Sequence, residues 1–197
     1  MSANEQNPET AVTPLSLRII REEHQALARV LKSMAEQLAE MRRSNALPDF
    51  AAWRAMLFYL DEFPERLHHP KESELLFPKL RSRAPLLRDT LDDLEQEHQR
   101  GGRAIRDLTH ALMAFEMMGE ARRQEFEAMA ERYIAGYFHH IATEESEVFP
   151  VAIKVLREED WQELDSAFAK NCDPLTGHPV DEPYQALFEK ILQATQG

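Results

Sequence analysis

One short motif occurs twice in this chain, 72 residues apart, and it constrains the fold more than any other feature. In each copy a histidine stands four positions before a glutamate, and a Phe-Pro pair begins five positions after that glutamate. His68 and Glu72 thus align with His140 and Glu144 without a gap. In register, the two copies are Leu67–Pro78 (LHHPKESELLFP) and His139–Pro150 (HHIATEESEVFP).

A second pair of histidines extends this internal similarity. His24 lies in the local sequence Glu-His-Gln, and His98 lies in the same local sequence 74 positions later. Each of these histidines precedes its half's His-x-x-x-Glu motif. The chain therefore consists of two related halves, each with two histidines and one glutamate in the same order.

Apolar periodicity places the two earlier histidines on helices. From Leu17 to Met41 apolar residues recur every three or four positions with one gap, which His24 fills. A second stripe from Leu87 to Phe115 has a similar gap at His98. Because such a stripe is the buried side of a helix in a bundle, both histidines are predicted to face the core.

The two motifs lie on two further helices. One is predicted to begin near Asp49, a suitable N-cap, and its hydrogen bonding is interrupted at Pro70, where we expect a kink. The other runs from Phe126 through the second motif. Residues four apart on a helix differ by about 40° in direction, so each histidine and its glutamate share a face.

These four helices predict an all-α fold. Their short connections favour an antiparallel up-down-up-down four-helix bundle followed by short C-terminal helices. The predicted domains are a disordered tail at residues 1–12, the bundle at 13–157 and a C-terminal helical extension at 158–197.

The composition of the chain disfavours several classes of binding partner. The net charge of −12 disfavours nucleic acid and anionic membrane surfaces, and no stretch of about 18 apolar residues predicts a membrane span. The polar start of the chain lacks a secretion signal, and the one cysteine, Cys172, cannot form an internal disulfide. We expect a cytoplasmic protein, and the sequence leaves a homo-oligomer open.

Four buried histidines and two buried carboxylates favour a metal site. Burying these groups without compensation costs several kcal/mol per charge. Bound cations would offset this cost. The alternative is that the His-Glu pairs are internal ion pairs or solvated faces. Imidazole and carboxylate without thiolate suit iron, with manganese or zinc as alternatives. The predicted metal ligands are His24, His68, Glu72, His98, His140 and Glu144.

The expected arrangement holds two ions. His24 and His68 would bind one ion, and His98 and His140 would bind the other. Glu72 and Glu144 would bridge the pair, which leaves positions open for a solvent bridge and an exogenous ligand.

The order and spacing of these residues resemble the hemerythrin-like (HHE cation-binding) family. The resemblance covers roughly residues 14–157. It implies an antiparallel four-helix bundle with a non-heme di-iron centre, oxo- or hydroxo-bridged. It also implies chemistry with dioxygen, nitric oxide or peroxide at an open iron position.

The chain departs from the oxygen-carrying members of that family in two places. Carriers have a further histidine one turn after the third-helix ligand, where this chain has Gly102, and an aspartate five residues after the last histidine, where this chain has Glu144 four residues after it. One iron would therefore lose a ligand near Gly102. A set of four histidines and two glutamates is similar to that of di-iron proteins implicated in iron–sulfur cluster repair.

Several neighbouring residues have alternative interpretations. Glu65 and Glu95, each three positions before a predicted ligand, match the Glu-x-x-His spacing of ferritin-like bundles, which we rank second. Tyr137 is either a hydrogen-bond donor beside the metal or a core aromatic. His69 and His139 are predicted to point about 100° away from the ligands, at their outer side or at the surface.

A glycine pair and two further histidines complete the candidates. Gly101 and Gly102 indicate either close helix packing or access for a small ligand. His110 and His178 are predicted to be surface residues.

Three functions are compatible with the sequence, which does not decide whether the protein is an enzyme. The first is reversible binding or sensing of dioxygen or nitric oxide. The second is an enzyme-like role in nitrosative or oxidative stress defence, by reduction of peroxide or nitric oxide or by iron–sulfur cluster repair. The third is a structural zinc-binding or metal-free helical interaction module.

Overall fold

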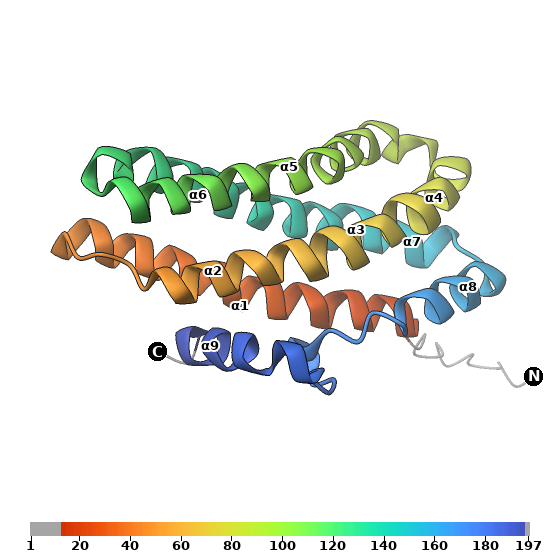
Figure 1. The fold of residues 1–197 in the computed structure, drawn as a ribbon. Coiled ribbons are helices and arrows are strands. Elements are labelled where there is room, and N and C mark those ends of the chain that lie inside the picture. The colour runs from red at the N-terminus through yellow and green to blue at the C-terminus, as the bar shows by residue number, and fades with distance from the viewer. Residues whose placement is uncertain (1–12, 196–197) are drawn as a thin grey trace, which may run out of the picture.

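The computed structural model describes residues 13–195, and Figure 1 shows their fold. The tail predicted to be disordered, residues 1–12, lies outside this range. Within residues 13–195 every regular element is a helix. The prediction of an all-α fold is therefore confirmed.

The first helix, α1, spans Leu15–Ser44. It begins after Pro14, which fixes the extended backbone that precedes a helix, and it ends at Asn45 in the left-handed conformation (φ 56°). As predicted, its buried face includes His24 as well as the apolar stripe.

The second helical run is continuous but irregular. It consists of α2 (Phe50–Leu60), the π-helix η1 (Asp61–His68), α3 (His69–Lys71), the π-helix η2 (Glu72–Leu76) and α4 (Phe77–Arg83). Asp49 accepts hydrogen bonds from two backbone N–H groups of the first turn of α2, so the predicted N-cap is confirmed. The two π-helices stand on either side of Pro70.

The second half of the bundle repeats the organisation of the first. A short 3₁₀ turn, η3 (Pro85–Leu87), leads into α5 (Arg88–Met118), and Gly119 (φ 67°) turns the chain into α6 (Glu120–Thr143). A π-helix, η4 (Glu144–Val148), and α7 (Phe149–Val155) continue α6. In Figure 1 these runs lie beside α1 and the second run, and residues of α6 contact both α5 and α1.

The buried interior has a polar layer between two hydrophobic clusters. On α1 one cluster ends at Ile20 and the other begins at Leu27, with His24 between them. On α5 the corresponding limits are Leu94 and Ile105, with His98 between them. The apolar clusters therefore pack the helices together on either side of the layer that contains these histidines.

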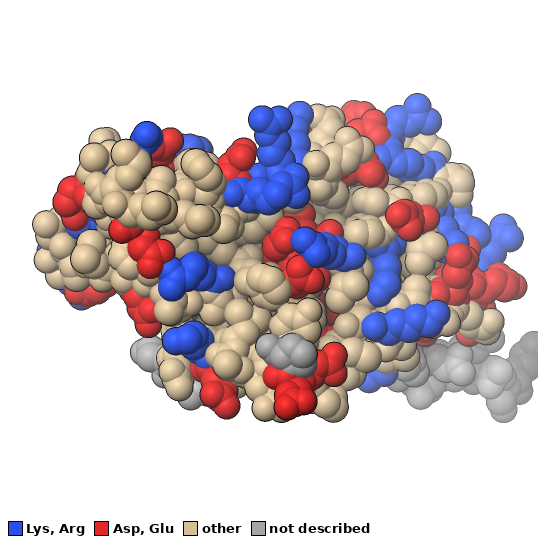
Figure 2. Space-filling view, viewed as in Figure 1, with Lys and Arg blue, Asp and Glu red and all other residues tan. Residues whose placement is uncertain are grey.

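The remaining residues fold back on the bundle. Helix α8 (Glu158–Phe168) packs on α1, and after the turns η5 (Pro174–Thr176) and η6 (Glu182–Tyr184), α9 (Gln185–Thr195) packs on α1 and α2. No helix within residues 13–195 has the length and apolar character needed to cross a bilayer. On the face in Figure 2, acidic and basic side chains are interspersed.

Candidate metal centre

All six predicted ligands lie in the polar layer, with side chains that are at most 7% exposed. Their nitrogen and oxygen atoms converge in two groups. Each group offers four ligand atoms that lie within 4.8 Å of one another. The first group is His24, His68, Glu72 and Glu144, and the second is His69, Glu72, His98 and His140.

The first group joins three of the helical runs. His24 Nε2 lies 3.3 Å from Glu144 Oε2, and His68 Nε2 lies 3.2 Å from Glu72 Oε2. The centroids of the two imidazole rings are 5.1 Å apart. Two imidazoles and two carboxylates thus meet in a volume suited to one divalent ion.

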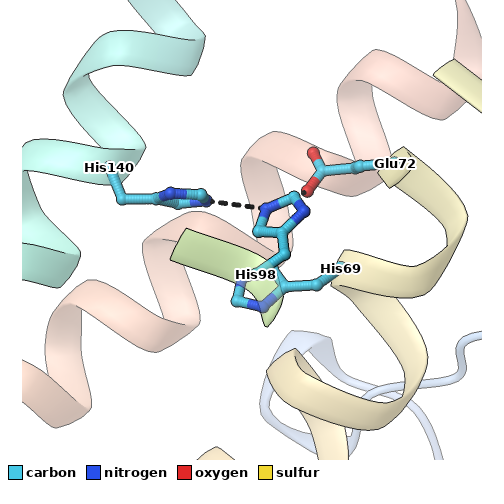
Figure 3. Close-up of side chains that lie close together, drawn as sticks. All are labelled: His69, Glu72, His98 and His140. Atoms are coloured by element: carbon cyan, nitrogen blue, oxygen red, sulfur yellow. Dashed lines mark hydrogen bonds and ion pairs between the residues drawn. The ribbon is translucent and has the colours of Figure 1, made fainter. Parts of the chain in front are cut away.

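The second group surrounds His98, as Figure 3 shows. His98 Nε2 lies 3.1 Å from His140 Nε2 and 3.7 Å from Glu72 Oε2. Glu144 Oε1 lies 3.5 Å from His140 Nε2 and 3.9 Å from His98 Nε2. Both glutamates therefore contact both groups.

The structure corrects the expectation for His69. Its side chain does not point away from the ligands but is 6% exposed and belongs to the second group. Its ring stacks on that of His98, with centroids 4.2 Å apart. His139, for which the same direction was predicted, is exposed.

A helix in a bundle has neighbours on more than one side, so a residue about 100° from the ligand face can still be buried. His69 meets His98 of the neighbouring helix α5 in this way. The internal repeat contained a signal for this. Position 69 aligns with Ile141, which lies in the regular helix α6 and is partly buried against the core.

Equivalent glutamates in the two halves contact the outer ring nitrogens of the motif histidines. Glu23 Oε2 lies 2.7 Å from His68 Nδ1, and Glu97 Oε2 lies 2.8 Å from His140 Nδ1. In each half the glutamate is the residue just before the first histidine. A carboxylate bonded to Nδ1 leaves Nε2 free to bind a metal and fixes the ring's direction.

The other two histidines also have Nδ1 partners. His24 Nδ1 lies 3.0 Å from Glu145 Oε1, and His98 Nδ1 lies 2.8 Å from Ser73 Oγ. Ser73 and Glu145 occupy equivalent positions, each one residue after a ligand glutamate. The repeat therefore places both the ligands and the groups that orient them.

The pKa values divide the histidines into two kinds. Burial, together with the charge of neighbouring histidines, lowers the pKa of His69 and of His98, so both imidazoles are neutral. Burial opposes protonation of His140 as well, but the Glu144 charge and the hydrogen bond to Glu97 raise its pKa to about 9. The pKa of His68 is likewise raised, because Glu72 and Glu23 outweigh burial.

The donor set fits a bound cation. The oxygens of Glu72 and of Glu144 are buried, as is His68 Nε2, and among the described residues these atoms form no hydrogen bond of regular geometry. Their contacts are imidazole–carboxylate pairs at 3.2 Å or more, such as His68 Nε2 to Glu72 Oε2. Buried polar groups with so little hydrogen bonding are costly unless something compensates them. Metal ions in the two groups would pair with these atoms and displace protons from the histidines with raised pKa values.

Tyr137 and Glu65 lie beside the second group. The Tyr137 hydroxyl donates a hydrogen bond to Glu65 Oε1 at 2.6 Å and lies 3.5 Å from His69 Nε2. A side chain at Gly101 would place its Cβ 2.3 Å from Glu65 Oε2, so any larger residue there would displace the Glu65 carboxylate. At Gly102 the nearest neighbouring atom would be 3.4 Å away, on the Arg106 side chain.

The ferritin-like alternative receives no support from this geometry. Within residues 13–195, neither Glu65 nor Glu95 belongs to a group of four converging ligand atoms. Burial raises the pKa of Glu65 to about 7, in spite of the hydrogen bond from Tyr137. Glu65 thus contacts Tyr137 and lies outside both ligand groups.

Two cavities border the centre. A small one of about 20 Å³ is lined by histidines of both groups, by the apolar side chains Leu27, Phe63 and Ile141, and by Asn171 and Asp173. This volume is enough for one water-sized molecule. A larger hollow of about 210 Å³ lies beside Tyr137 and His140.

The fold and these groups define a helical metal-binding protein. The sequence model of the hemerythrin HHE cation binding domain matches residues 15–152, and the chain therefore belongs to that family. An uncharacterized protein of Haemophilus influenzae is 35% identical over 81 residues, 40% of this chain. The match spans 45% of the length of that relative.

Proposed function

We propose that this protein holds a pair of iron ions in an antiparallel up-down-up-down four-helix bundle and binds or reacts with a small ligand there. The ligand would be dioxygen, nitric oxide or peroxide. The observation that supports this most strongly is the pair of ligand groups that share Glu72. A carboxylate shared by two ligand groups can bind two neighbouring ions at once, whereas a site for one ion does not need a shared carboxylate.

The proposed ligands follow the geometry. His24 and His68 would hold the first ion, His98 and His140 would hold the second, and Glu72 and Glu144 would be shared between them. His69 would offer the second ion a third imidazole, which would compensate for the glycine at position 102. A small ligand would approach through the cavity of about 20 Å³, whose lining includes His24 and His68.

The surrounding residues suit a small, weakly polar ligand. Iron, when bound, supplies electrons and a coordination position for dioxygen, nitric oxide or peroxide. Leu27, Phe63 and Ile141 keep bulk water from the cavity and limit its size. The Tyr137 hydroxyl, which is buried and hydrogen-bonded to Glu65, is placed to donate a proton at the edge of the centre.

The main alternative is an enzyme-like role in nitrosative or oxidative stress defence or in iron–sulfur cluster repair. The hollow beside Tyr137 and His140 favours it, because it offers a product or electron donor a second approach to the centre. Repeated turnover of peroxide or nitric oxide would support this alternative. A stable, reversible adduct would support binding or sensing.

Metal analysis after anaerobic reconstitution tests the proposal. We expect about two irons per chain, as the ligand count requires, and lower iron content in His68→Ala and in His140→Ala. His139→Ala is the matched control, because His139 adjoins a ligand but is exposed. A wild-type protein that binds zinc alone, or no metal, would instead identify a structural module.

A further inference from the structure

The C-terminal extension contributes two buried polar side chains to the polar layer. Asn171 and Asp173, in the segment after α8, are 5% and 4% exposed. Both line the small cavity next to His24 and His68. They lie outside residues 15–152, so the family match does not account for them.

Asn171 extends the hydrogen-bonded chain that begins at a ligand. Its Nδ2 donates to Glu23 Oε2 at 3.0 Å, and the same oxygen accepts from His68 Nδ1 at 2.7 Å. Glu23 is 7% exposed, so little water competes for this carboxylate. Asn171, Glu23 and His68 thus form a continuous path from the extension to the first ligand group.

The other half of the molecule provides an internal comparison. The Glu97–His140 contact, at 2.8 Å, has nearly the same length as the Glu23–His68 contact. Glu97, however, has a side chain that is 43% exposed, and among residues 13–195 no hydrogen bond joins it to the extension. The two halves therefore differ in one respect: the extension hydrogen-bonds the glutamate beside the first ligand group, and not the one beside the second.

The segment that carries Asn171 is held in place from both sides. Tyr59 donates a buried hydrogen bond of 2.7 Å to Asp173 Oδ2, and the Leu175 N–H donates to Asp173 Oδ1. Arg29 donates to the backbone oxygen of Leu175. Between Asn171 and Asp173, Cys172 adopts a left-handed backbone (φ 48°), which turns both neighbours inward.

We propose that Asn171 is a positioning residue of the metal centre: by holding the Glu23 carboxylate, it fixes the direction in which the His68 imidazole presents Nε2 to the first ion. The proposal rests on the proposed function, since it assumes that His68 is a ligand. If Asn171 has this role, the C-terminal extension helps to orient a metal ligand and does more than pack on the bundle.

Site-specific affinity for iron tests this role. Fe²⁺ is titrated anaerobically into the full chain against a competing chelator, for the wild type and for Asn171→Ala. Substitution of outer-sphere partners of metal-bound histidines weakens affinity by about 10–100-fold, and we expect about tenfold here. Introducing Asn171→Ala into a His140→Ala background, which retains the first ion, should give the same loss. In a His68→Ala background it should have no further effect.

Ser33→Ala controls for weaker docking of the extension. Ser33 Oγ donates to the backbone oxygen of Ala194 at 2.6 Å, a single hydrogen bond between α1 and the extension at a distance from the ligands. This variant should retain wild-type affinity for both ions. If Ser33→Ala weakens the first ion as much as Asn171→Ala does, the extension acts by docking alone and the proposal is wrong.

Two further outcomes would overturn it. Equal affinities of the wild type and Asn171→Ala in a protein that binds two ions would exclude a positioning role. So would an equal loss in the His140→Ala and His68→Ala backgrounds. A wild type that binds no iron would instead refute the proposed function, so the two failures are distinguishable.

Discussion

Replacing His69 by leucine tests whether the second ion has a third imidazole ligand. Leucine has a similar volume, so the metal-free protein should change in stability by less than about 1.5 kcal/mol. Part of that change is the loss of stacking on His98, worth about 0.5–1.5 kcal/mol. The His69 side chain is 6% exposed, and the protein contacts of its ring nitrogens are long: Nδ1 lies 3.5 Å from Glu65 Oε2, and Nε2 lies 3.5 Å from the Tyr137 hydroxyl. The Tyr137 hydroxyl keeps its hydrogen bond to Glu65 Oε1 in the leucine variant, so little hydrogen bonding is lost.

Metal binding should respond far more strongly. Substitutions of outer-sphere partners weaken metal affinity by about 10–100-fold, so removal of a direct ligand should weaken the second ion by at least about 100-fold. This corresponds to about 2.8 kcal/mol at about 1.4 kcal/mol per factor of ten. The assay is iron content after reconstitution and gel filtration, with thermal unfolding of the metal-free protein measured in parallel.

We expect His69→Leu to retain about one iron per chain where the wild type retains about two. His139→Leu is the matched control, since His139 is the exposed neighbour of a ligand in the other half. A His69→Leu protein with two irons, wild-type affinity and an unchanged absorption spectrum would refute the assignment of His69 as a ligand.

Two further predictions concern the metal-free protein. Burial raises the pKa of Asp173 to about 6 in spite of the hydrogen bond from Tyr59, so folding stability should fall as pH rises from about 4 to about 6, by up to about 3 kcal/mol. Asp173→Asn should remove that part of the pH dependence, and urea midpoints with the same pH slope as the wild type would contradict this. Arg123→Ala should lower stability by about 3 kcal/mol, because the buried guanidinium donates to the backbone oxygens of Met41 and Ala46 at 2.7 and 2.8 Å. An unchanged urea midpoint would show that these contacts contribute little.

The sequence predicted the helical fold and the polar layer because both depend on local periodicity. The apolar stripes required the four histidines to face inward, and the repeated motif placed Glu72 and Glu144 one turn after two of them. The Asp49 N-cap followed from the same local rules. These features need no knowledge of how the helices pack.

Features that depend on contacts between distant segments were not predictable in this way. His69 is buried because it meets His98 of the neighbouring helix α5, and helical periodicity alone does not say which helix lies on that side. Asn171 contacts Glu23, which lies 148 positions away in the sequence, and no local sequence pattern predicts this contact. Gly101 indicates close packing in the sequence, but the sequence does not show that its neighbour is Glu65.

Iron content combined with a Mössbauer spectrum of the ⁵⁷Fe-reconstituted protein tests the central claim most directly. Because Glu72 belongs to both ligand groups, we expect about two ferric ions per chain that are magnetically coupled through shared ligands. One iron per chain, or two irons with the spectrum of isolated ferric ions, would contradict the shared-ligand centre.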